Sequence, residues 1–426
     1  MTVAQTILPR LADPAHLDRR TGAIVFLAFA AAYFCSALVR AITATLSPVL
    51  TQEFTLHARD LGLLAGGYFF GFAAIQLPLG KWLDKHGPKH VILWFLSLAV
   101  LGCLAFSMAS SFTWLLAARV LVGMGVGACL MAPLTGYRRW FDASTLLRAN
   151  SWMLMTGSLG MLASTLPVQW LLPLTGWRAL FWILAAMILL AMVAIVWLVP
   201  AWQANTKPRA GATDVEAAAA SGSYSEIWKN RYFRKMVPLA FFNYAGLVAM
   251  QTLWAGPWLI KVSGYTPLEA ATGLFCINGA MLLTFWSWGM ANPWLAARGW
   301  STDRLVTWGA PVSMVLLAAN ILGGSSTGWQ GWAVFCMATS VMGLMQPAVG
   351  MAFRSSLAGR ALSAYNLAIF AGVFVVQWGI GLLIDAFTDI GFAQVASFQA
   401  AMGVYLCCCI ASYAYFVSMK ADNSPQ

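Results

Sequence analysis

Residues 80–90 read Gly80-Lys81-Trp82-Leu83-Asp84-Lys85-His86-Gly87-Pro88-Lys89-His90. This basic segment separates two long apolar stretches, at roughly 61–83 and 90–110. A positively charged loop between two membrane spans would explain the lysines. It would not explain the spacing of Gly80, Asp84 and Gly87, in which one carboxylate lies between two residues that permit tight turns and close helix approach.

The composition of the whole chain identifies the flanking stretches as membrane spans. The chain has 426 residues, of which 60% are hydrophobic and 9% are charged, whereas a soluble protein has about 25% charged residues. A span needs roughly 20 apolar residues. The sequence predicts twelve, at roughly 23–50, 61–83, 90–110, 114–136, 150–172, 177–200, 236–260, 267–290, 303–323, 329–351, 362–386 and 392–419. The first is too long for a cleavable signal and has no clean cleavage site after it.

The distribution of basic residues predicts the orientation. Of the 25 Lys and Arg residues, 20 fall in the termini and loops on one side, three fall on the other side, and Arg40 and Arg119 fall inside spans. Because cytoplasmic loops are rich in Lys and Arg, both termini are expected to be cytoplasmic. The basic residues are scattered over short loops, which excludes a nucleic-acid interface. No Asn-x-Ser/Thr sequon occurs, which is consistent with a bacterial inner membrane.

A long polar segment divides the spans into two sets of six. We expect an N-terminal bundle over 1–202, a cytoplasmic linker over 203–235 and a C-terminal bundle over 236–426. Two such halves are typical of secondary transporters, although a channel or a membrane-bound enzyme can also have twelve spans. All eight cysteines lie in predicted spans without a CxxC pair or a Cys/His cluster, so no metal or cofactor site is expected.

The segment 80–90 resembles the signature loop of the major facilitator superfamily, which has glycine, three residues, aspartate, a basic residue, one residue and glycine, followed by basic residues. The matching positions are Gly80, Asp84, Lys85, Gly87 and Lys89, whereas Pro88 stands at a usually basic position. The resemblance implies an all-α membrane protein with twelve transmembrane helices in two pseudo-symmetric six-helix bundles. It also implies a gating role for this loop, in which the aspartate meets the N-terminal end of the eleventh helix. A carboxylate is stabilised at such a positive helix end.

A second motif begins at Arg119 in the fourth span, where Gly123 follows four residues later. It resembles the fourth-helix motif of the same superfamily, with Val122 in place of the usual glutamine. The resemblance gives Arg119 and Gly123 a role in gating, with the arginine in proton transfer or helix bridging. An arginine that holds carbonyl groups of neighbouring helices is the alternative. The glycines at 123, 125 and 127 lie inside an apolar span, which favours close helix packing over a dinucleotide loop.

Arg40 is the main candidate for substrate binding. It is the only charge between Arg20 and Glu53, and an ionisable group at membrane depth is by default a functional-site hypothesis. The other members of its polar stripe, at helical spacing, are Tyr33, Ser36, Thr43 and Ser47. Its position eight residues before Pro48 is similar to that in branches of the superfamily that carry organic anions. The competing interpretation is an arginine that snorkels to the interface.

The spans contain no obvious counter-charge for Arg40. All 14 acidic residues and all four histidines lie outside the span interiors, with Asp385 closest. Cationic substrates are therefore disfavoured, and coupling to H+ or Na+ would depend on the substrate or on Glu53 and Asp60. The remaining substrate-binding candidates are Asn243, Tyr244, Gln251, Trp254, Gln346 and Asn366. They provide aromatic walls and placed hydrogen-bonding groups, and the alternative role for them is bonding between helices.

The sequence thus predicts a monomeric secondary transporter for a small anionic or zwitterionic organic metabolite, working in the lipid bilayer by alternating access. An exporter of amphipathic compounds is one alternative, suggested by 21 Trp and 20 Met. The fifth span lacks the Gly-Pro pair of drug–proton antiporters, which argues against this exporter. The second alternative is a non-transporting sensor or assembly partner with the same fold. No hydrolase or kinase motif occurs, so we expect no enzyme activity.

Overall fold

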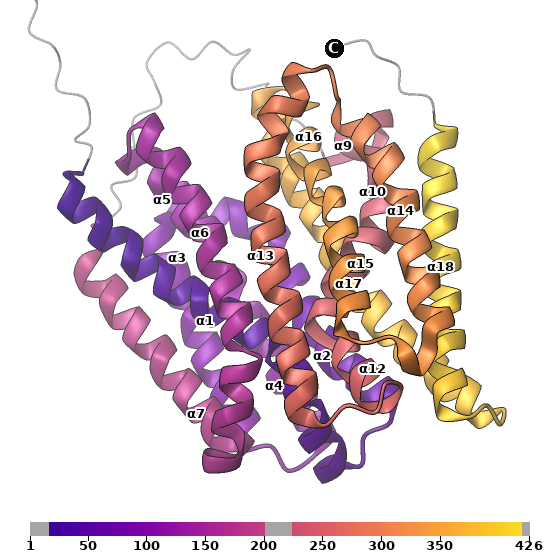
Figure 1. The fold of residues 1–426 in the computed structure, drawn as a ribbon. Helices are drawn as coiled ribbons and strands as arrows, with labels where there is room; N and C mark the ends of the chain where they lie inside the picture. The colour runs from indigo at the N-terminus through magenta and orange to yellow at the C-terminus, as the bar shows by residue number, and fades with distance from the viewer. Residues whose placement is uncertain (1–16, 201–223, 420–426) are drawn as a thin grey trace, which may run out of the picture.

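A computed structural model describes residues 17–200 and 224–419, and within these ranges the chain is helical with no strand. Figure 1 shows two groups of long helices that stand side by side. The first group is drawn in indigo to magenta and comes from the first half of the chain. The second, in red to yellow, comes from the second half. This arrangement is the predicted pair of bundles.

The first half turns at two glycines inside long helical segments. Its elements are α1 (Arg19–Phe54), α2 (Ala58–Ala74), α3 (Gln76–Ser107), α4 (Phe112–Val126), α5 (Met131–Trp140), α6 (Ala143–Ala163) and α7 (Leu166–Leu198). Gly87 interrupts α3 with φ 77°, and Gly176 interrupts α7 with φ 72°, a conformation that glycine adopts without a steric penalty. The start of α3 therefore completes the second span, and the start of α7 completes the fifth.

The second half begins inside the predicted linker. The segment 203–223 lies outside the described residues, and α9 (Tyr224–Lys229) already forms a helix. The seventh span consists of α10 (Arg231–Leu239), η1 (Ala240–Tyr244), α11 (Ala245–Ala249), η2 (Met250–Trp254) and α12 (Ala255–Lys261). The remaining elements are α13 (Pro267–Ala297), α14 (Thr302–Gly323), η3 (Gly324–Ser326), α15 (Trp329–Thr339), η4 (Ser340–Leu344), α16 (Met345–Met351), α17 (Ser355–Asp389) and α18 (Gln394–Ser418).

Ten helical stretches in the described ranges are long and apolar enough to cross a membrane. The second and fifth spans are the other two, because each is divided between a shorter helix and the segment before Gly87 or Gly176. The prediction of twelve membrane helices is confirmed. Most helices extend a few residues beyond the apolar stretch that predicted them.

The molecule has two distinct ends. We call the end where α1 begins and α18 ends the basic end, since it also carries the turn at Gly87 and its lysines. We call the opposite one the Asp385 end. In Figure 1 the two halves lie together at the Asp385 end and diverge toward the basic end.

Glycines allow the helices of the first half to pack backbone against backbone. A Cβ atom on Gly123 of α4 would overlap the Tyr68 carbonyl of α2, and one on Gly71 of α2 would overlap the Val120 carbonyl of α4. The contact is therefore possible only without side chains at these positions. It confirms the interpretation of the glycine run in the fourth span as a packing surface, and it fixes α2 beside Arg119.

Candidate functional site

Arg40 lies midway along α1 and is surrounded by aromatic rings. Its guanidinium carbon is 6.0 Å from the centre of the Phe72 ring on α2. The phenols of Tyr33 and Tyr68 are close enough to interact with it electrostatically. Tyr244, on η1 of the second half, also interacts with Arg40 and Tyr33. The site therefore includes groups from both halves of the molecule.

Arg119 is a buried cation beside this site. Its side chain is 1% exposed, and its two terminal nitrogens donate to the carbonyls of Val39 at 2.9 Å and Arg40 at 3.2 Å. The guanidinium lies 5.0 Å from the centre of the Tyr68 ring, in a cation–π geometry. Arg119 thus joins α4 to the part of α1 that carries Arg40. These bonds match the alternative interpretation of Arg119, in which the arginine holds carbonyl groups of a neighbouring helix.

Neither arginine has an acidic partner among the described residues. The ion pairs between described residues lie toward the two ends of the molecule: Arg59 with Asp60 and Asp385, Arg178 with Glu53, Lys235 with Asp303, and Arg354 with Glu226. The Nε atoms of Arg40 and Arg119 are both buried without a hydrogen-bond partner in the described structure. Unpaired buried charge is costly, so an anion at this position would be stabilised.

The predicted stripe on α1 lies together around Arg40. Tyr33 is buried against α6, where Gly157 leaves room for its ring because a Cβ there would crowd it. Ser36 is buried and its hydroxyl has no partner among the described residues, while its carbonyl accepts a long hydrogen bond of 3.5 Å from Tyr68. Thr43 is also buried. These groups line one side of the candidate site.

The predicted residues of the second half lie mostly in hydrogen bonds with neighbouring helices. Asn243 donates to Ser412 at 3.0 Å, and Gln251 donates to Asn278 at 3.4 Å. Two further bonds run from the Trp254 indole to the Gln377 carbonyl at 3.1 Å and from Gln346 to Asn366 at 2.8 Å. All four join elements of the second half. Tyr244 of this predicted set lies close enough to Arg40 for an electrostatic effect between the two groups.

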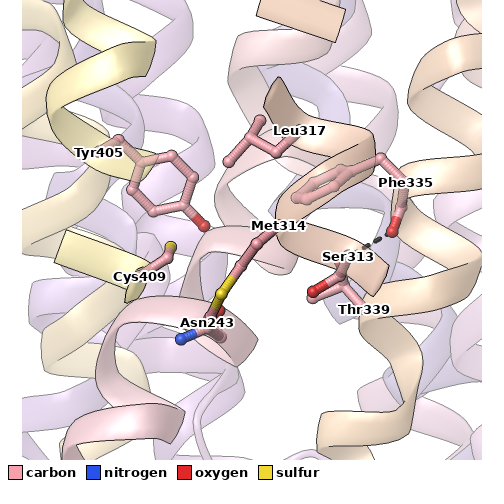
Figure 2. Close-up of a pocket in the computed structure, with 8 residues that line it drawn as sticks. All are labelled: Asn243, Ser313, Met314, Leu317, Phe335, Thr339, Tyr405 and Cys409. Atoms are coloured by element: carbon pink, nitrogen blue, oxygen red, sulfur yellow. Dashed lines mark hydrogen bonds between the residues drawn. The ribbon is translucent and has the colours of Figure 1, made fainter. Parts of the chain in front are cut away.

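Asn243 belongs to a separate cavity within the second half. Figure 2 shows it opposite Tyr405 and Cys409 of α18, with Ser313 and Thr339 on the far side of Met314. The space that these side chains enclose has no room for a water molecule. It therefore cannot hold a metabolite in this state.

The seventh span contains two π-helical turns, and Tyr244 on the first of them lies near Arg40. The turn η1 carries Asn243 and Tyr244, and the turn η2 carries Gln251 and Trp254. Short π-helical insertions occur frequently at functional sites, because they change the direction of side chains within a helix. Four of the ten predicted substrate-binding residues thus lie on irregular turns.

Phe72 and Phe370 are missing from the sequence-based set. Their rings, from α2 and α17, are 4.4 Å apart and tilted by 56°. The pair joins the two halves directly beside Arg40. An aromatic residue inside an apolar span gives no sequence signal that would separate it from its lipid-facing neighbours.

The predicted gating loop lies open at the basic end. Gly80, Asp84 and Lys85 are exposed, and a Cβ on Gly80 would meet no atom within 4 Å. Gly87 is buried in the turn that its left-handed conformation allows. The Asp84 carboxylate has no hydrogen bond or ion pair to any described residue, so its expected contact with the N-terminal end of α17 is not formed in this state.

Residues 29–377 match the family described as Major Facilitator Superfamily. The chain belongs to this superfamily. Its members are transporters built on two six-helix bundles, which is the arrangement in Figure 1.

Curated relatives within the superfamily differ in what they transport. Over 312 residues the chain is 25% identical to the 4-hydroxybenzoate transporter PcaK of Acinetobacter baylyi, covering 66% of this chain and 67% of that protein. It is also 25% identical over 248 residues to the multidrug resistance protein MdtL of Shigella dysenteriae, covering 56% of this chain and 59% of that protein. The second alignment spans less than two thirds of that relative.

Solved structures of transporters share the fold. A bacterial homologue of the human lysosomal transporter Spinster, in an inward-facing and unoccupied conformation, has a TM-score of 0.77 at 16% identity. That comparison covers 96% of this chain and 100% of the other. A D-xylose–proton symporter has a TM-score of 0.75 at 14% identity, covering 95% and 99%. At these identities the likeness concerns the fold alone.

Proposed function

We propose that this member of the superfamily moves a small organic anion across a bacterial inner membrane by alternating access, with Arg40 binding the anionic group. The observation that carries the proposal is the pair of cations, Arg40 and Arg119, without a carboxylate partner among the described residues. A substrate carboxylate would supply the missing charge and accept hydrogen bonds from a planar guanidinium.

The surroundings of Arg40 favour an anion with an aromatic ring as the first compound to test. The Phe72 ring lies 6.0 Å from the guanidinium carbon, and Tyr33, Tyr68 and Tyr244 are close enough to interact with it electrostatically. Pockets for small molecules combine aromatic walls with a few polar groups. The relative PcaK is named for the transport of 4-hydroxybenzoate. That compound carries one carboxylate and one ring, and therefore fits both features.

Export of amphipathic compounds is the second candidate function. It is supported by the resemblance to MdtL and to the multidrug resistance protein D of Escherichia coli, together with the aromatic walls. An uncompensated positive charge disfavours cationic drugs, however, because like charges repel at short range. A neutral or cationic amphipathic compound that bound more tightly than 4-hydroxybenzoate would favour this second function.

The proposed orientation places the basic end in the cytoplasm, with both termini there, as the distribution of Lys and Arg indicates. The termini themselves lie outside the described residues. Coupling to H+ or Na+ would have to use groups away from the centre. Glu53 is already bound by Arg178 and by the Trp177 indole, both at 2.6 Å, and Asp60 accepts from the His57 N–H at 3.0 Å.

Substitution of Arg40 tests the proposed function. Arg40→Gln should weaken the binding of 4-hydroxybenzoate by at least roughly 30-fold, since removing one partner of a desolvated charge pair costs about 2–5 kcal/mol. Arg40→Lys keeps the charge and loses the planar fork, so its loss should be smaller. Binding is measured by calorimetry on the purified protein.

Arg20→Gln is the matched control, because Arg20 lies on the same helix but is exposed in its first turn. It should bind like the parent. If the Arg40 variants fold normally and also bind like the parent, Arg40 is part of the scaffold and the proposal of an anionic substrate is wrong.

A further inference from the structure

At the Asp385 end, one carboxylate connects the two halves. Asp385 lies near the end of α17, and its two oxygens accept hydrogen bonds from the backbone N–H groups of Ala58 and Arg59, both at 3.0 Å. These are the first two residues of α2. Its side chain is 16% exposed, and the Arg59 Nε lies 3.9 Å away. The contact therefore joins α17 of the second half to α2 of the first half.

Asp385 adds to the cap of α2, which already has a capping box formed by His57 and Asp60. The first N–H groups of a helix have no partner within the helix, and they carry a partial positive charge that favours a carboxylate. In most helices a side chain just before the first turn accepts these bonds. Here Asp60, in the first turn, accepts only from His57, and the donors of Ala58 and Arg59 are satisfied from the other half.

Close packing of α2 against α17 continues from this contact toward Arg40. A Cβ on Gly62 would overlap the Gln377 carbonyl, and one on Gly381 would overlap the Ala58 carbonyl. Further along, Gly66 lies against Phe374, and the seam reaches Phe72 and Phe370 beside Arg40. Asp385 therefore lies at the outermost point of a continuous seam that closes the site at this end.

Alternating access requires this seam to open, because the halves must separate at the Asp385 end before the site can be reached from there. Separation takes the carboxylate away from α2 and leaves the Ala58 and Arg59 donors without this acceptor. The bonds of Asp385 thus exist only in the state closed at this end. An interaction made in one state and not in the other shifts the equilibrium between them.

We propose that Asp385 and the N-terminal turn of α2 form a latch that stabilises the state closed at the Asp385 end. It is the counterpart of the latch expected for Asp84 at the basic end. In each case a carboxylate of one half meets the N-terminal end of a helix in the other half. In this structure the Asp385 latch is closed and Asp84 has no partner among the described residues.

Accessibility of Ser47 provides the test. Ser47 lies on the same stripe of α1 as Arg40, on the side toward the Asp385 end, and is 3% exposed. The eight native cysteines are replaced, Ser47→Cys is introduced as a reporter, and the purified protein is treated with a maleimide in detergent without substrate. Mass spectrometry gives the labelling rate. Purified protein is used so that the result does not depend on the orientation in the membrane.

Asp385→Asn should raise the labelling rate several-fold, since it removes the charge at the helix end while keeping the shape of the side chain. Asp385→Ala should raise it at least as much. Asp389→Asn is the matched control, because Asp389 is exposed one turn further along the same helix. It should label like the parent.

The proposal is overturned if Asp385→Asn labels at the parental rate, or if Asp389→Asn accelerates labelling equally. The isosteric Asn variant decides the matter if the Ala variant fails to fold. The experiment contains no substrate, so failure of the latch and failure of the proposed anion binding are recognised separately.

Discussion

At the scale of single residues, the structure separates the charged candidate from the amide candidates, because Arg40 has no acidic partner among the described residues. Arg40 is conspicuous in the sequence because a charge at membrane depth is expensive. From the sequence, the amides of Asn243, Gln251 and Gln346 are equally suitable for binding a substrate. In the structure each of them bonds to a neighbouring helix. A single sequence cannot distinguish these roles, because the same side chain satisfies a substrate or another helix.

Arg119 gives the prediction at this scale. Arg119→Met removes a buried charge that has no acidic partner in the described structure, so the thermal stability of the empty protein should be unchanged or higher. Anion binding should weaken by roughly 5–10-fold, because a positive charge close to the site is worth on the order of 1 kcal/mol. Thermal unfolding and calorimetry with 4-hydroxybenzoate measure the two effects.

Arg119→Lys serves as the control that keeps the charge, and it should recover part of the affinity. A large fall in melting temperature together with unaltered affinity would show instead that Arg119 matters only as a link between α4 and the carbonyls of Val39 and Arg40.

At the scale of helices, apolar length predicted the twelve spans, since the bilayer sets that length. It did not predict where helices are interrupted. The π-helical turns η1 and η2 have ordinary sequences, Ala240–Tyr244 and Met250–Trp254. No local pattern in these two segments predicts a π-helical turn. The glycine positions were easier to interpret, because the absence of a side chain has a direct meaning for helix contacts.

Gly123 provides the prediction for this scale. Gly123→Ala places a Cβ against the Tyr68 carbonyl, and such overpacking typically costs about 1–3 kcal/mol. Thermal inactivation of the purified protein should therefore begin at a lower temperature. Gly80→Ala is the matched control, since its Cβ would meet no atom within 4 Å. It should be neutral or slightly stabilising, because glycine is unfavourable inside a helix. Equal losses in both variants would contradict the packing argument.

At the scale of the whole molecule, the two ends differ in the present state. The Asp385 latch is closed, and the loop that resembles the superfamily signature is exposed. The sequence predicted a gating role only for the loop at 80–90. The Asp385 latch depends on a contact between α2 and α17, which lie more than 300 positions apart in the chain. In the sequence alone, Asp385 is an acidic residue at the boundary of a span. Contacts between distant helices are what the sequence pattern leaves undetermined.

The two latches predict opposite effects on one equilibrium. With the Ser47→Cys reporter, Asp84→Asn should slow labelling, because it weakens the state closed at the basic end, and it should also slow transport. Asp385→Asn should accelerate labelling. The two residues lie at opposite ends of the molecule, so their free energies should add to within about 0.3–0.5 kcal/mol. The double variant should therefore label more slowly than Asp385→Asn alone, at the rate given by the sum of the two single-variant free energies, within a factor of about two. If it labels like Asp385→Asn alone, Asp84 contributes nothing to the equilibrium, and the signature loop has kept its sequence pattern without the function that the pattern implies.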